Sequence, residues 1–177
     1  MQPIIFLLDA VISFFCTLFL LRFMMQAMRV SFAGQPGTFV VALTNWAVKP
    51  LRRIIPGIAG LDWSSVFAAF ALQLLLTGMV VVLSGRVGEL DPVGMAPMIL
   101  WFALRGLLRL TVYIMIGALI LQAVLSWVNP YSPLAAPAQQ LTRPILDPIR
   151  RFVPLIGGVD LSLLVAVLLL QVILMLL

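Results

Sequence analysis

Two pairs of adjacent arginines, Arg52-Arg53 and Arg150-Arg151, are the charged groups of this sequence best suited to bind a ligand. A guanidinium group donates hydrogen bonds from a planar fork that matches a carboxylate or a phosphate. Beside an apolar segment, the same group also attracts the anionic headgroups of a membrane. The pairs therefore predict either a simple anchor to the inner leaflet or a site for a lipid headgroup or an acidic segment of a partner protein.

Each arginine pair is followed, about ten residues later, by an aspartate and then a serine: Asp62 with Ser64, and Asp160 with Ser162. Because an apolar helix is expected to begin at this point, the carboxylate and the hydroxyl can bind its free backbone amides. We expect these residues to cap the helices. An ion pair from each aspartate to the arginines would also tie the preceding loop to the helix, and proton carriage by the aspartates is the alternative hypothesis.

Among the polar side chains within apolar segments, the candidates for a functional role are Gln73, Gln171 and Asp9. Each glutamine follows an aspartate by eleven residues, which is about 16 Å along a helix and close to the centre of a bilayer. We expect both amides to face the interior of a helix bundle and to bond to another helix, with a permeation site as the alternative. Asp9 is expected near the outer boundary, where water reaches a carboxylate, and Arg22 near the opposite boundary, where its side chain can extend to the headgroups.

Several kinds of chemistry are excluded by residue types that the sequence lacks. It has no histidine and a single cysteine, Cys16, so we expect no disulfide within the chain, no metal site and no haem. It also shows no nucleophile with a base and no phosphate-binding glycine loop, so we expect no enzyme and no cofactor. The net charge of +5 comes without a long basic run, so we expect no nucleic-acid binding, and Cys16 is interpreted as a packing residue.

The elements that must position these residues are apolar helices. The chain has 177 residues, of which 63% are hydrophobic and 10% are charged, whereas soluble domains have about 45–50% and about 25%. Four segments are long and apolar enough to cross a bilayer, at about 4–28, 64–84, 110–128 and 161–177. The sequence therefore predicts an all-α integral membrane protein with four transmembrane helices.

The segment 89–109, between the second and third spans, is expected to form an interfacial helix. Its apolar part, 93–104, is too short to cross a hydrocarbon core of about 30 Å. Arg105 and Arg109 follow at helical spacing, and both guanidinium groups can extend to the headgroups. A fifth, tilted span is the alternative.

The loops after the first and third spans carry most of the basic residues. Seven lysines and arginines lie there, against Arg86 and the two arginines of segment 89–109 on the opposite side. By the positive-inside rule, these two loops face the cytoplasm and both termini face outward. In the second loop, Asp147 followed by Pro148 is typical of a helix start and predicts a short amphipathic helix that Pro154 ends.

The chain contains an internal repeat. A shift of 98 residues places segment 43–73 on segment 141–171 without a gap, and 26–27 matches 122–123 at a shift of 96. The identical pairs include residues that apolar bias alone does not align: Pro50/Pro148, Arg52/Arg150, Arg53/Arg151, Asp62/Asp160, Ser64/Ser162 and Gln73/Gln171. We therefore expect two units, 1–88 and 110–177. Each is a helical hairpin with two spans and the same orientation, so the repeats are parallel, around an axis along the membrane normal.

The sequence LTRPILDPIRRFVPLIGGVDLS at 141–162, preceded by SWVNP at 126–130, resembles the YggT family. The resemblance covers essentially the whole chain and implies a small integral protein of the bacterial inner membrane, with plastid relatives. It also implies links to ion or osmotic homeostasis, to envelope or division organisation, or to assembly of membrane cytochromes. The first copy departs from the motif at three positions: Asn45, Trp46 and Lys49 stand where the second copy has Arg143, Pro144 and Asp147.

These observations predict a non-catalytic inner-membrane protein that assembles with or organises other membrane proteins through its basic cytoplasmic loops. The expected partners are anionic lipid headgroups and other membrane proteins or further copies of the chain, with no small-molecule substrate indicated. The alternative is an ion-linked channel or transporter component that uses the two glutamines at mid-membrane depth.

Overall fold

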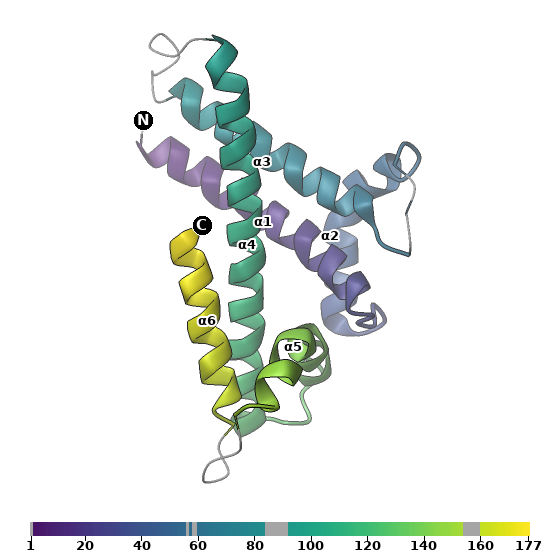
Figure 1. Cartoon of the computed structure of the whole chain (residues 1–177). Coiled ribbons are helices and arrows are strands. Elements are labelled where there is room, and N and C mark those ends of the chain that lie inside the picture. Colours follow the sequence, from purple (N-terminus) through teal and green to yellow (C-terminus); the bar gives the residue numbers. More distant parts are fainter. Residues whose placement is uncertain (1, 56, 58–59, 84–91, 154–159) are drawn as a thin grey trace.

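The computed structural model describes residues 2–55, 57, 60–83, 92–153 and 160–177 of the chain. Within these ranges the chain forms helices and no strand, which confirms the all-α class. Pro154 and Arg86 lie outside the described residues. Figure 1 shows the six helices, which are α1 (Gln2–Ala27), α2 (Gln35–Leu51), α3 (Trp63–Leu83), α4 (Pro92–Val128), α5 (Ala135–Arg150) and α6 (Ser162–Leu176).

Three of these helices, α1, α3 and α4, are long and apolar enough to cross a membrane. The bounds of α1 and α3 lie within two residues of the first two predicted spans, because each apolar run ends in polar or glycine-containing sequence. The fourth predicted span forms α6, a helix of 15 residues that is about 22 Å long.

The described part of the segment between the second and third spans, 92–109, is helical. It continues into the third span as one helix, α4, which has 37 residues and is about 55 Å long. The helix continues through Arg105 and Arg109 because leucine, alanine and arginine in this stretch favour a helix, and Gly106 is covered by Gln73. Arg105 is half-buried and Arg109 is exposed along this helix.

The two basic loops contain long helices, α2 and α5, that were not predicted. In each of them the buried residues recur every three or four positions: Gly37, Val40, Thr44 and Val48 in α2, and Ala138, Leu141, Thr142 and Leu146 in α5. This spacing places one side of each helix against the rest of the protein. The α2 helix starts close to the preceding turn, since a Cβ on Gly37 would lie 2.5 Å from the Cα of Phe32.

The predicted helix start at Asp147-Pro148 is wrong. The α5 helix begins twelve residues earlier, at Ala135, and it includes both Pro144 and Pro148 before it ends at Arg150. An interior proline removes a backbone hydrogen bond, but burial of the apolar side of α5 outweighs this loss. The arginine pairs therefore lie at the carboxyl ends of α2 and α5, where the helix dipole favours a positive charge.

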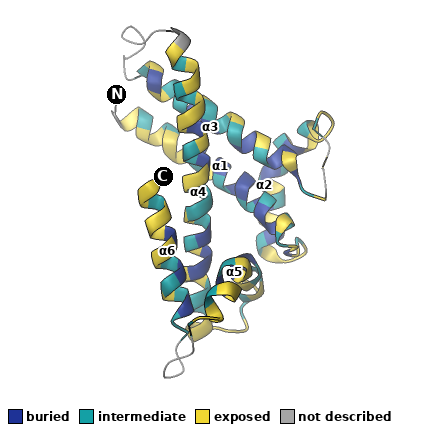
Figure 2. Ribbon diagram, viewed as in Figure 1, coloured by how far each residue is buried: buried dark blue, intermediate teal, exposed yellow. Residues whose placement is uncertain are grey.

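Four helices, α1, α3, α5 and α6, contact α4, whereas α2 contacts α1 and α3. Figure 1 shows α1 and α3 crossing one half of α4, while α6 lies beside its other half and α5 lies near the start of α6. The core between these helices contains Phe19, Met25, Leu119 and Leu146, all nearly inaccessible. Figure 2 shows that α6 and the first half of α1 are largely exposed, as expected for apolar helices that face lipid or another protein.

Candidate functional site

The first arginine of each pair binds the aspartate that begins the next helical segment. Arg52 donates from Nε to Oδ1 of Asp62 at 3.2 Å and from Nη2 to Oδ2 at 2.6 Å, so the contact is bidentate. Arg150 donates from Nε and Nη2 to Oδ2 of Asp160, at 3.0 and 2.8 Å. The ion pair expected between loop and helix is therefore present in both units.

The second arginine of each pair is placed differently. Arg53 and Arg151 are exposed, and neither guanidinium group bonds to another residue in the part of the chain that the structure describes. Each pair thus consists of one arginine that is bound to an aspartate and one whose guanidinium group is free to bind a partner. The sequence gives no signal for this division, because both members lie nine or ten residues before the aspartate.

In the first unit, the aspartate also holds an arginine from α1. Nε of Arg22 lies 3.3 Å from Oδ2 of Asp62, and the exposed fractions of the two side chains are 7% and 1%. Arg22 also donates from Nη1 to Oγ1 of Thr44 at 2.7 Å and to Oδ1 of Asn45 at 3.0 Å, both on α2. The expectation that Arg22 extends to the headgroups is wrong, because this buried network of acceptors holds it inside the protein.

The second unit has a smaller polar network at the same place. Ala118 stands where the repeat places Arg22, and Thr142 of α5 instead donates to Oε1 of Gln122 on α4. Arg143, the counterpart of Asn45, is exposed. The two units therefore share the ion pair between arginine and aspartate, but only the first adds a buried arginine to it.

The pKa values of the two aspartates are consistent with this arrangement. Burial alone would raise the pKa of Asp62, but hydrogen bonds and charge from Arg52, together with Ser65 and Arg22, bring it below its usual value. Burial likewise opposes ionisation of Asp160, and bonds from Ser162 and Arg150 lower its pKa on balance. Both carboxylates are therefore ionised at neutral pH, which suits a tether for arginine better than a proton carrier.

The hydroxyl of Ser64 closes a loop and does not cap a helix, and the hydroxyl of Ser162 has no hydrogen-bond partner among the described residues. Ser64 donates from Oγ to the carbonyl oxygen of Ile55 at 2.8 Å. Ser162 donates its backbone N–H to Oδ1 of Asp160 at 3.0 Å, so Asp160 does satisfy an amide at the start of α6. Asp62 instead accepts from the Oγ of Ser65 at 3.1 Å.

Comparison with known proteins explains why the chain carries this arrangement twice. The family model described as CCB3/YggT matches residues 1–83 and 101–177, which correspond to the two units. The chain belongs to the CCB3/YggT family. No solved structure matches it.

Relatives of this YggT-family chain extend over nearly its whole length. The uncharacterized protein YggT of Escherichia coli is 35% identical over 98% of this chain and 88% of its own length. An uncharacterized protein of Pseudomonas aeruginosa is 36% identical over 89% of this chain and 79% of its own length. An uncharacterized protein encoded in the proC 3' region of Vibrio alginolyticus is 33% identical over 93% and 88%.

The two mid-span glutamines of this YggT-family chain lie in different surroundings. Gln73 is buried between α3 and α4, where a Cβ on Gly106 would lie 2.2 Å from its Nε2. Its Oε1 has no hydrogen-bond partner among the described residues. Gln171 is exposed on α6, so the expectation that both amides face the interior is wrong for Gln171. Asp9 is exposed, as expected, and accepts from Oγ of Ser13 at 3.5 Å.

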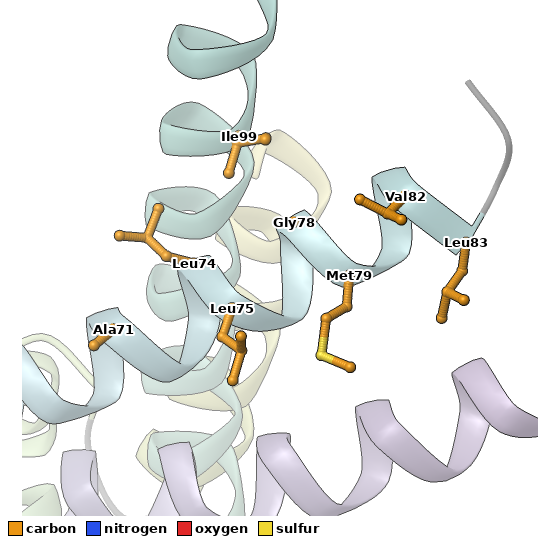
Figure 3. Close-up of a pocket in the computed structure, with 8 residues that line it drawn as sticks. All are labelled: Ala71, Leu74, Leu75, Gly78, Met79, Val82, Leu83 and Ile99. Carbon is orange, nitrogen blue, oxygen red and sulfur yellow. The ribbon is translucent and has the colours of Figure 1, made fainter. Parts of the chain in front are cut away.

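The groove along α3 is lined by apolar residues. This groove has a volume of about 690 Å³. Figure 3 shows Met79 of α3 pointing toward α1 and Ile99 projecting from α4. The residues that line it are Ala71, Leu74, Leu75, Gly78, Met79, Val82, Leu83 and Ile99. Among the described residues, no three His, Cys, Asp or Glu side chains lie close enough to hold a metal ion. Cys16 is buried and lies 3.4 Å from the carbonyl oxygen of Ala69.

Proposed function

We propose that this protein is a non-catalytic component of the bacterial inner membrane that assembles with other membrane proteins through Arg53 and Arg151. The observation that carries this proposal is the division of each arginine pair. Because Arg52 and Arg150 are held by aspartates, the adjacent free arginines extend from a fixed backbone at the ends of α2 and α5. A guanidinium group held in this way is already positioned to bind an acidic segment, which lowers the entropic cost of binding.

In this proposal the chain has four spans, α1, α3, the apolar part of α4, and α6. The length and composition of the first three support this arrangement, and α6 is apolar but shorter. The two units are parallel, with the arginine-bearing helices on the cytoplasmic side and both termini outside. The excess of basic residues in these two loops supports that orientation.

The neighbours of the free arginines favour a protein partner. Ile54 follows Arg53 and is 78% exposed, and Phe152 follows Arg151 and is 86% exposed. An exposed apolar side chain beside a fixed cation suits a partner segment that carries both an acidic group and an apolar surface. Anionic lipid could occupy the same place, so the experiment below separates the two ligands.

The transport alternative would need the two mid-span glutamines to act together. In this chain Gln73 is packed against α4, whereas Gln171 is on the exposed side of α6. The two amides therefore do not line a common path within one chain, and assembly is the function that the geometry supports better.

The test is site-specific photocrosslinking in native membranes from position 152, next to Arg151. We expect a crosslinked membrane protein whose yield falls sharply with Arg151→Glu and partially with Arg151→Lys, because lysine keeps the charge but not the fork. The matched control is Arg143→Glu, which changes an exposed arginine of the same helix and should leave the yield unchanged. Crosslinks to lipid alone, or a yield that does not respond to Arg151→Glu, would refute the proposal.

A further inference from the structure

One side of α6 is exposed although the corresponding side of α3 is covered. Leu164, Leu168, Gln171 and Met175 follow one another at helical spacing along α6, and all four are exposed. At a shift of 98 residues, their counterparts on α3 are Val66, Phe70, Gln73 and Thr77, which are half-buried or buried. The repeat therefore places the same kind of surface in two different environments.

The surface on α3 is covered by α4. Gly106 of α4 lies against the amide of Gln73, and Leu107 packs in one cluster with Phe70. Ala103, one turn before Leu107, is fully buried. The contact between α3 and α4 joins the two regions that the family model matches, 1–83 and 101–177.

The surface of α4 that makes this contact also has a counterpart, on α1. At a shift of 96 residues, Ala103, Gly106, Leu107 and Leu110 correspond to Leu7, Ala10, Val11 and Phe14. All four α1 residues are exposed. The chain therefore carries an exposed copy of each side of its own contact between units, one on α6 and one on α1.

We infer that a second copy of this chain covers these surfaces, with α6 of each copy packed on α1 of the other as α3 packs on α4. Within one chain α6 contacts only α4 and α5 among the described helices, so it does not cover its own α1. Two such contacts related by a twofold axis close a dimer and leave neither surface free. This inference does not rest on the proposed role of the free arginines.

The polarity and direction of the helices support a second copy as the partner. The helices α3 and α4 are consecutive spans and run in opposite directions, and α6 and α1 also run in opposite directions if both termini face the same side. An exposed amide such as Gln171 is unfavourable against lipid chains, whereas a helix partner can accept or donate to it. Ala10 carries a Cβ where Gly106 has none, and a Cβ at Gly106 would lie 2.2 Å from the amide of Gln73. The side chain of Gln171 must therefore take a different rotamer from Gln73 in this contact.

Cysteine crosslinking between differently tagged chains tests this arrangement. In a Cys16→Ala background, one chain carries Leu168→Cys and the other carries Val11→Cys, the counterparts of Phe70 and Leu107. Oxidation in the membrane should form a disulfide that joins the two tagged chains. The positive control is Phe70→Cys with Leu107→Cys, which should join α3 to α4 within one chain. The negative control replaces Leu168→Cys with Leu75→Cys, which is similarly exposed but lies on a different side of the molecule.

Two outcomes of the crosslinking would overturn the inference. A product that forms only when both cysteines are in one chain would mean that α6 closes on its own α1. If no product forms while the control within one chain does, lipid or another protein covers α6.

A second measurement concerns the amide itself. In purified protein reconstituted into lipid vesicles, Gln171→Leu should raise the dissociation constant of the dimer by about 8- to 300-fold, because each dimer contains the contact twice and one hydrogen bond between membrane helices accounts for about 3- to 18-fold. Gln171→Asn, which keeps an amide, should have a smaller effect. An unchanged or lower dissociation constant for Gln171→Leu would contradict the placement of Gln171 in the contact.

Discussion

Replacement of Asp62 by asparagine should destabilise the protein far more than the same change at Asp160. Asp62 and Arg22 have exposed side-chain fractions of 1% and 7%, so Asp62→Asn leaves a buried guanidinium group without a counter-charge. Removal of one member of a buried ion pair costs about 3–5 kcal/mol. Asp160 and Arg150 are 23% and 37% exposed, and water can solvate Arg150 after Asp160→Asn, so the cost there is about 0–1 kcal/mol. The two units thus provide the variant and its matched control in one chain.

The free energy of unfolding of both variants can be measured by reversible unfolding in mixed micelles, with tryptophan fluorescence as the signal. Arg22→Ala combined with Asp62→Asn should recover part of the loss, because it removes the unpaired cation and restores the residue that Ala118 provides in the second unit. The cost of the double change should therefore be less than the sum of the two single changes. Equal costs for Asp62→Asn and Asp160→Asn would refute the assignment of a buried charge network to the first unit alone.

Three further predictions follow from the same geometry. The pKa of Asp62 is lower in the folded protein than in the unfolded chain, so the ionised carboxylate contributes its full stabilisation above the unfolded value of about 4. This stabilisation should be lost as the pH falls below that value. The free energy of unfolding of Asp62→Asn should therefore depend less on acid pH than that of the unmodified protein. Gly106→Ala should lower the free energy of unfolding by about 1–3 kcal/mol, because the new Cβ would lie 2.2 Å from the side chain of Gln73. Gly117→Ala on the same helix has open space around the new Cβ, so it should not lower the free energy of unfolding in the same assay. In a Cys16→Ala background, cysteines at the termini should react with a membrane-impermeant reagent in intact spheroplasts and cysteines at Ala33 or Tyr131 should not; the reverse pattern would overturn the proposed orientation.

The parts of the fold that were predictable from the sequence are those decided by local composition. The apolar runs of α1 and α3 are long, and each ends where charged or turn-forming residues begin, so their bounds could be predicted within two residues. The ion pairs of Arg52 with Asp62 and of Arg150 with Asp160 could also be anticipated, because the repeat preserves both partners and their spacing.

The helices α2 and α5 could not be predicted in the same way. Their sequences are less apolar, and α5 contains Pro144 and Pro148, which favour a helix start or end when only local preference is considered. Burial of Leu141 and Leu146 against the rest of the protein outweighs that preference. The site depends on this tertiary effect, because it determines that the arginine pairs end a helix instead of beginning one.

The repeat also shows why equal sequence does not imply equal environment. Gln73 and Gln171 occupy equivalent positions, yet only Gln73 is buried, since α3 packs against α4 whereas α6 has no helix of the first unit against it. A tandem pair that does not close on itself always leaves two unmatched surfaces, and here those surfaces are the exposed sides of α6 and α1. The difference between the two glutamines is therefore a consequence of chain connectivity, and a contact that repeats the one between α3 and α4 would remove it.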